Sequence, residues 1–386
     1  MITDAGDQAQ LRHRLAQPQS SGSSFSSTHS LTDLDFSSPY ELQESILDAY
    51  QQTRDDQSFL PKRDLFRLIT PESVARELSN VLGVSFTAAQ IKSLAQSVCT
   101  ETEIKQNGKT KIKSFRKIFA LLVIAEASST IPRFLDENVS DLDLPLIPIK
   151  APGIRGFSRK NSTNPLICFE RWSPMKLRNF HDNQWRMLAA FFSHDGSGDV
   201  KHYKLQDQHI LPFVASSGKG DDDVEIRGGY GRVFMVHIHG DHHNFPDVAS
   251  QVCDQGFAVK QQLYDTDRQS FEKEAYILKL FSGPHGHAHI VSLLATYEHS
   301  GKYHLIFHRA ESNLLTFWKQ VERQPTFDYG NILWMSEQCA GIAEGLHRLH
   351  KRLTFTLQQG SAPLGPRLAS DGTYHRLSRY TSRCLR

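Results

Sequence analysis

Two strand-forming runs set the strongest limit on how this chain can fold. The run RVFMVHI (232–238) alternates apolar and polar residues, and FAVKQQL (257–263) is a second run of the same type. Such runs predict half-buried β-strands, so we expect a hairpin here. Gly228, Gly229 and Gly231 come directly before the first run. They therefore belong to a β-turn, whereas the glycines of Walker and Rossmann loops open a helix.

A lysine lies within the second run, and a glutamate lies in the segment that follows. If Lys260 on this apolar strand is buried, it needs a partner, because burying an unpaired charge is costly. Alternatively, the strand lies at the sheet edge and Lys260 points to solvent. Residues 266–284 predict a helix whose apolar positions include Phe271 and Leu278. Glu274 lies three residues after the first and four before the second, on the same face. A carboxylate there needs a cation, and Lys260 is the candidate.

Several further elements follow from turn and capping residues. Thr266 and Gln269 predict the capping box of the helix just described. Two more strand-type runs flank a turn at residues 299–302, and a short helix capped by Ser312 or Asn313 comes after them.

The last predicted element is a long helix over residues 331–350. Its apolar residues repeat at steps of three and four, which predicts a buried amphipathic helix. These residues are Ile332, Met335, Cys339, Ile342, Leu346 and Leu349.

The first third of the chain has a different character. Residues 41–135 predict an α-helical module, including a helix with Thr70 as its N-cap and Gly83 as its end. Residues 1–40 are rich in Ser, Gln and Gly, so we expect them to be disordered. Residues 136–212 are rich in Pro and Gly, and we expect a linker there.

Composition excludes some classes of function. The formal net charge of +2 argues against a dedicated nucleic-acid binder. Five scattered cysteines without a CxxC pair favour an intracellular, cytoplasmic or nuclear protein. The N-terminus has no secretory h-region, and the longest apolar run, residues 118–127, is far shorter than a membrane span.

The order of elements from residue 213 to residue 352 resembles the eukaryotic protein-kinase family. GGYGRV (228–233) is similar to the glycine-rich loop, FAVK (257–260) to V-A-I-K, and Glu274 to the glutamate of helix C. The resemblance implies an α+β fold with an antiparallel five-stranded sheet and helix C. The first helices of a truncated C-lobe would follow, and the helical module would precede the domain.

The resemblance also implies ATP as the ligand. Glycine amides would cover the phosphates, Lys260 would hold the α- and β-phosphates, and Val233 and Ala258 would pack on adenine. Phe307 would lie near the gatekeeper, and His308 to Ala310 would form the hinge. The residues implied in ATP binding are Gly228, Gly229, Gly231, Val233, Ala258, Lys260, Glu274, Phe307, His308 and Ala310.

Two departures from the family pattern limit what the resemblance implies. The first glycine of the six-residue loop motif is replaced by Ile226, and no HRD or DFG motif follows the long helix. In the family, the aspartate of HRD is followed five residues later by an asparagine. The only acidic residue after position 350 is Asp371, and the residue five positions later is Arg376. No catalytic residue and no Mg²⁺ ligand is therefore assigned, and we expect no kinase activity from this chain alone. A truncated gene model and a genuine fragment both fit. Residues 353–386 are expected to form a disordered basic tail.

Two alternatives to ATP binding remain open. One is a non-catalytic, pseudokinase-like scaffold that recruits a protein partner through the helical module. The other is a zinc site in the connection after the first strand, because imidazole suits zinc. Its ligands would come from His237, His239, Asp241, His242 and His243.

Overall fold

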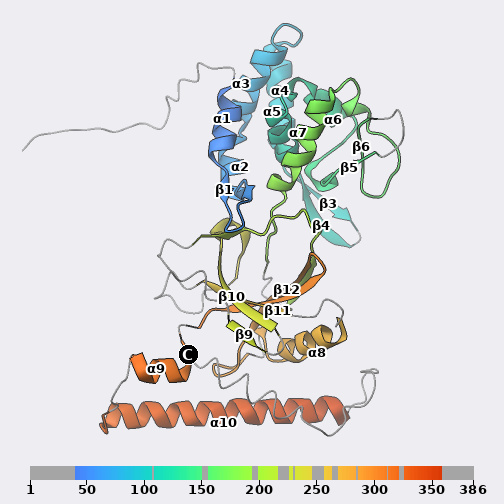
Figure 1. The fold of residues 1–386 in the computed structure, drawn as a ribbon. Helices are drawn as coiled ribbons and strands as arrows, with labels where there is room; N and C mark the ends of the chain where they lie inside the picture. Colours follow the sequence, from blue (N-terminus) through green and yellow to red (C-terminus); the bar gives the residue numbers. More distant parts are fainter. Residues whose placement is uncertain are drawn as a thin grey trace, which may run out of the picture. The chain divides into compact units, whose positions relative to one another are not determined.

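The fold is of the α+β class, as predicted, with helices and short hairpins first and a mixed sheet after them (Figure 1). The computed structural model describes residues 40–106, 108–149, 155–193, 199–215, 226–228, 231–245, 256–262, 268–283, 286–310, 312–320 and 326–358. The predicted disorder in residues 1–39 and 359–386 lies outside the described residues, as do Gly229 and the predicted cap Thr266.

Helices dominate the chain up to residue 136. The elements are α1 (Glu41–Asp48), β1 (Gln51–Gln52), β2 (Ser58–Phe59), α2 (Lys62–Leu68), α3 (Pro71–Leu82), α4 (Ala88–Cys99), β3 (Thr102–Gln106), β4 (Lys109–Lys113), α5 (Arg116–Ile124), the 3₁₀ turn η1 (Ser128–Thr130) and α6 (Ile131–Asp136). Shorter elements continue with η2 (Asp141–Asp143), β5 (Ile147–Pro148), β6 (Phe157–Ser158), η3 (Ile167–Phe169), α7 (Pro174–Gln184) and η4 (Trp185–Met187).

The ends of α3 confirm the prediction made from its capping residues. The side chain of Thr70 accepts a hydrogen bond from the Ser73 amide at 3.2 Å, and the Ser73 hydroxyl accepts one from the Thr70 amide. Pro71 occupies the first helical position, where its missing N–H leaves no bond unmade. Gly83 follows the last residue of the helix.

The hydrophobic core of the helical part extends well beyond residue 135. Every residue of α5 from Ile118 to Ile124 is buried, and the core around it includes Val139, Phe157 and Met187. Described residues of the predicted linker and connecting segment (136–212), from Val139 to Met187, therefore contribute to this core. The proline- and glycine-rich loops there carry apolar side chains into the same core.

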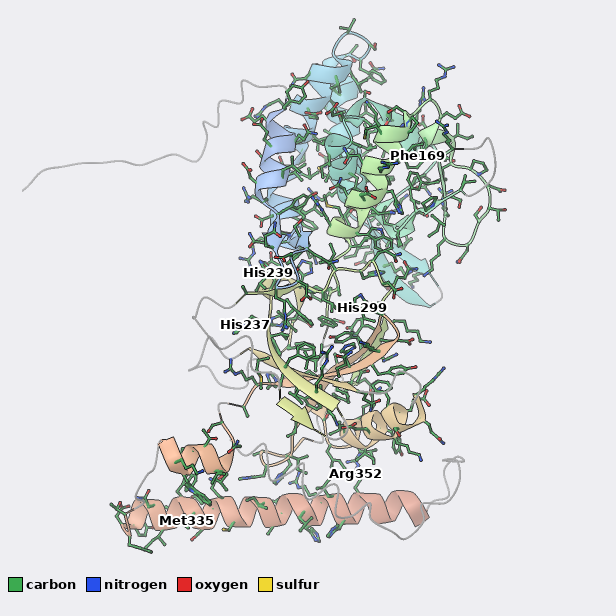
Figure 2. The ribbon with its side chains drawn as sticks, in the orientation of Figure 1. Phe169, His237, His239, His299, Met335 and Arg352 are labelled. Atoms are coloured by element: carbon green, nitrogen blue, oxygen red, sulfur yellow. The ribbon has the colours of Figure 1, made fainter. Side chains whose placement is uncertain are left out.

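Aromatic side chains make much of this added core. The ring of Phe169 lies 5.1 Å from Phe134, 4.8 Å from Phe157 and 5.1 Å from Phe180, measured between ring centroids. Figure 2 shows Phe169 within the helical part of the chain. Residues from both sides of the predicted boundary thus share one aromatic cluster.

A curled mixed sheet forms the second part. Its strands are β7 (Lys201–Lys204), β8 (Phe213–Val214), β9 (Ile226–Gly228), β10 (Gly231–Ile238), β11 (Phe257–Gln262), β12 (Leu293–His299) and β13 (Lys302–His308). The order is β7-β12-β13-β11-β10-β8, with β9 also paired to β10. The pairing of β7 with β12 is parallel, and the other pairings are antiparallel. The predicted five-stranded antiparallel sheet thus differs from the structure, because β7 and β8 add to it.

The helix α8 (Arg268–Lys279) packs on one face of this sheet. Its Phe271 and Ala275 form a small apolar cluster with Leu293 of β12 and Leu305 of β13. The other face has a larger core, which includes Val236, Phe257, Val259, Ala295, Tyr297 and Ile306. The two faces therefore have separate cores.

The last two helices are α9 (Leu314–Gln320) and α10 (Tyr329–Gln358). The Asn313 side chain accepts from the Thr316 amide at 2.8 Å, so one of the two predicted caps is confirmed. The helix α10 continues to Gln358, past the predicted start of the tail at residue 353.

The apolar stripe of α10 is not buried as predicted. Met335 is 49% exposed, and Ile332, Cys339, Ile342 and Leu346 are exposed as well; Leu349 is buried. Figure 2 labels Met335 on this helix. Gly341 and Gly345 instead lie against the loop of His287 and His289, where added Cβ atoms would approach the imidazoles to 3.3 Å or less. Glycine at these two positions therefore allows α10 to approach this loop closely.

Candidate functional site

Lys260 and Glu274 form an ion pair between the sheet and α8. The Lys260 ammonium donates to Glu274 Oε1 at 2.5 Å. The lysine side chain is 9% exposed and the glutamate side chain 29%. The strand β11 therefore carries a largely buried cation, and α8 supplies its carboxylate. The structure confirms this predicted contact.

A third side chain, which the sequence reasoning missed, joins this pair. Gln262 Nε2 donates to Glu274 Oε2 at 3.3 Å. Gln262 lies two residues after Lys260 on β11, and residues two apart on a strand share a face. This period-two spacing was the available signal. Both oxygens of the carboxylate are thus held by β11.

The strand register brings three further predicted residues, Val233, Ala258 and Phe307, to the face of Lys260. Val233 of β10 and Leu305 of β13 lie directly opposite Lys260. Phe307 lies directly opposite Ala258. Because opposite residues share a face and Ala258 is two positions from Lys260, all of these side chains lie on one face.

This face is only partly covered near Lys260. Val233, Ala258 and Phe307 are each half-buried, whereas Val259, which points to the opposite face, is fully buried. The ion pair therefore lies at the edge of an apolar surface that remains accessible among the described residues.

Two glycines of the glycine-rich stretch lie opposite each other on neighbouring strands. Gly228 at the end of β9 lies opposite Gly231 at the start of β10, so two residues connect the strands. A Cβ atom on Gly231 would lie 2.7 Å from the Gln261 carbonyl oxygen and 3.4 Å from Lys260 Cε. Glycine at this position therefore permits a close approach of β10 to β11 beside the ion pair.

Two residues of the predicted hinge, His308 and Ala310, lie at and just beyond the end of β13. His308 ends β13 opposite Phe257, whose side chain points to the opposite sheet face, and their rings lie 5.9 Å apart. Ala310 follows the strand and is half-buried. The structure therefore does not bring the His308 side chain to the face of Lys260.

The histidine-rich connection after β10 packs on the helical part of the chain. His242 lies edge-on to Phe59 at 4.8 Å, and its Nδ1 lies 3.0 Å from the Ala190 carbonyl. Burial lowers the pKa of His242 to about 4, so its imidazole is neutral at pH 7. Asp241 pairs with Arg63 at 3.0 Å. In the part of the chain that the structure describes, no three His, Cys, Asp or Glu side chains converge as metal ligands would.

No protein-family model matches the chain, and no curated protein matches it. Within the described ranges, no helix is both long and apolar enough to cross a bilayer.

Proposed function

We propose that this chain binds ATP on the sheet face that carries Lys260, in the manner of a protein-kinase N-lobe. The observation that carries the proposal is the 2.5 Å contact between Lys260 and Glu274. A lysine held by a carboxylate in this way has its ammonium group fixed in direction, as a phosphate ligand requires.

The surroundings of the ion pair support an adenine nucleotide over a simple anion. Val233, Ala258 and Phe307 provide a half-buried apolar surface on the same face. An adenine ring packed there would cover this surface, and Lys260 would contact the α- and β-phosphates. The backbone amides near Gly228 and Gly231 would lie over the phosphates, since glycine permits a close backbone approach.

The proposal covers nucleotide binding and assigns no catalytic residue. The alternative is a pseudokinase-like scaffold without a nucleotide, which is favoured by the exposed apolar residues of α10. Large apolar stripes on a surface are typical of protein–protein contacts.

Titration with a fluorescent ATP analogue, with and without Mg²⁺, tests the proposal. We expect saturable binding that Lys260→Met weakens about tenfold or more, because a charge-assisted contact with phosphate is lost. Lys279→Met is the matched control, since Lys279 is exposed on α8. The absence of saturable binding would favour the scaffold, and equal binding by the Lys260→Met protein would contradict the proposed site.

A further inference from the structure

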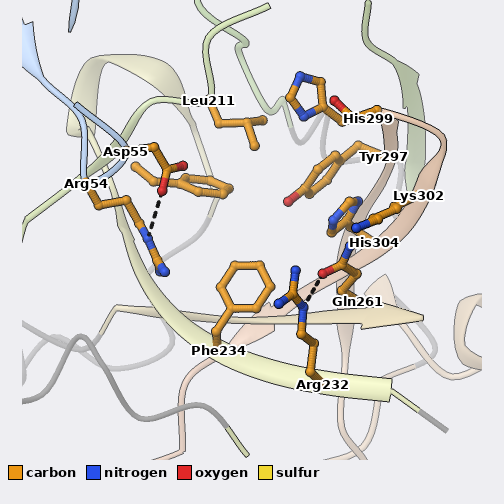
Figure 3. Close-up of a pocket in the computed structure, with 12 residues that line it drawn as sticks. Arg54, Asp55, Leu211, Arg232, Phe234, Gln261, Tyr297, His299, Lys302 and His304 are labelled. Carbon is orange, nitrogen blue, oxygen red and sulfur yellow. Dashed lines mark hydrogen bonds and ion pairs between the residues drawn. The ribbon is translucent and has the colours of Figure 1, made fainter. Parts of the chain in front are cut away.

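A cavity lies on the sheet face opposite to Lys260 and Glu274. Its volume is about 310 Å³, which is at the lower end of the range typical of small-molecule sites. Four of its residues form one row across the sheet: Arg232 of β10 pairs with Gln261 of β11, Gln261 with His304 of β13, and His304 with Tyr297 of β12. Figure 3 shows these side chains around the cavity.

The helical part of the chain closes the cavity on the other side. The Arg54 amide, in the loop between β1 and β2, donates to the Phe213 carbonyl at 2.8 Å. The guanidinium of Arg54 donates to the Met235 carbonyl at 3.2 Å and lies 5.3 Å from the ring of Phe234. Arg54 is therefore held over the sheet by contacts with residues about 160 to 180 positions further along the chain.

The described residues that line the cavity carry an excess of positive charge. Arg54, Arg232 and Lys302 supply three cations, and Asp55 supplies one carboxylate, 3.7 Å from Arg54 Nε. Burial lowers the pKa of His304 to about 3, so its ring stays neutral at pH 7. Arg232 Nε donates to Gln261 Oε1, which fixes the direction of this guanidinium. The excess of two positive charges matches a phosphate monoester, which carries about −1.5 to −2 at pH 7.

Buried polar atoms in the cavity lack partners among the described residues. Tyr297 is 0% exposed, and its hydroxyl has no hydrogen-bond partner. Burial raises the pKa of Tyr297, so this hydroxyl stays protonated and remains a donor. His304 Nδ1 and His299 Nε2 are also without partners. Buried polar groups are nearly always hydrogen-bonded, so these atoms are positions where a water molecule or a polar atom of a ligand would bind.

The remaining wall of the cavity is apolar. Leu211, Phe213 and Phe234 line it, and the ring of Tyr297 stacks on His304 with centroids 4.3 Å apart. A bare inorganic ion would leave this wall without a contact. A flat apolar group attached to the anion would cover it.

We infer that this cavity binds a small phosphate monoester with an aromatic or other flat apolar body. The phosphate would lie among Arg54, Arg232 and Lys302, with the Tyr297 hydroxyl as a further donor. The body would pack against Phe213 and Phe234. This site is separate from the proposed ATP site, and neither inference depends on the other.

Calorimetric titration of the full chain with phenyl phosphate tests the inference. We expect saturable binding that Arg232→Gln weakens about tenfold, because a charged contact with phosphate is lost. Tyr297→Phe keeps the stacking on His304 and removes the hydroxyl, so we expect binding about threefold weaker or more. Inorganic phosphate is expected to bind more weakly than phenyl phosphate, because it cannot cover the apolar wall.

Lys279→Gln is the control, because it removes a positive charge from the exposed side of α8. It should leave phenyl phosphate binding unchanged. Circular dichroism melting of each variant checks that the fold is retained, and Lys302→Gln replaces Arg232→Gln if the latter is unfolded. No saturable binding by the wild-type chain would overturn the inference. Unchanged binding in the charge variant that retains its fold would overturn it too, and inorganic phosphate binding as tightly as phenyl phosphate would refute the apolar body.

Discussion

Phe169→Ala is expected to lower the free energy of unfolding by about 3–5 kcal/mol, the range measured for large-to-small changes in well-packed cores. The ring of Phe169 is buried and lies within 5.1 Å of four other aromatic rings, from Phe134, Phe157, Trp172 and Phe180, between centroids. Alanine would leave a cavity lined by these four aromatic side chains, which come from different segments of the chain. Denaturant unfolding followed by fluorescence or circular dichroism measures the change.

The neighbouring position provides the control for this experiment. Ile167 is 64% exposed, so Ile167→Ala should change the free energy of unfolding by less than about 0.5 kcal/mol. A loss under about 1 kcal/mol for Phe169→Ala would mean that residues 157–180 are not part of the core. The predicted linker would then describe this segment better than the packing does.

Glu274→Ala is expected to lower the free energy of unfolding by about 2 kcal/mol. Removing one partner of a fully buried ion pair typically costs about 3–5 kcal/mol, because the other charge is left uncompensated. The 29% exposure of the Glu274 side chain lets water reach the pair, so the expected cost is smaller. Glu272→Ala in the same helix is the control. It breaks an exposed pair with Arg268 and should cost less than about 1 kcal/mol.

A double variant separates the stability of this pair from its proposed function. In Lys260→Met/Glu274→Met both charges are replaced by apolar groups, so most of the lost stability should return. Binding of the fluorescent ATP analogue should stay as weak as in Lys260→Met alone. A double variant as unstable as Glu274→Ala would contradict the assigned burial of Lys260. One that binds nucleotide normally would show that the pair is purely structural.

The sequence predicted most of the local structure, because the signals were themselves local. Thr70 and Gly83 are the ends of α3, and the alternation around Val233 and Val236 is typical of the strand observed. The contact of Lys260 with Glu274 was also predictable, since helical spacing placed the carboxylate on the inward face of α8. Only neighbouring elements were needed for these inferences.

Features that depend on distant packing could not be predicted in this way. The aromatic residues around Phe169 lie in irregular loops, where no period of two or 3.6 marks them as core. The parallel strand β7 has only four residues and pairs with a strand more than 90 positions later. The apolar residues of α10 repeat with the helical period, and this correctly predicted a helix. The period alone does not tell whether another element covers the apolar face, and most of that face is exposed.

The cavity that we propose to bind a phosphate monoester was beyond sequence reasoning for the same reason. Its cations come from the β1–β2 loop, from β10 and from β13, and only the sheet register brings them together. The unsatisfied Tyr297 hydroxyl has no signature in the sequence, since its burial results from packing on β7, β13 and Phe213.

Labelling with an acyl-phosphate derivative of ATP tests the proposed nucleotide site most directly. Such a probe transfers its acyl group to a lysine amine beside the bound phosphates, and peptide mass spectrometry identifies the modified residue. We predict acylation of Lys260 that excess ATP suppresses, with Lys279 labelled only to the background level of an exposed lysine. Labelling of Lys260 that ATP does not suppress, or ATP-protected labelling confined to other lysines, would contradict the account.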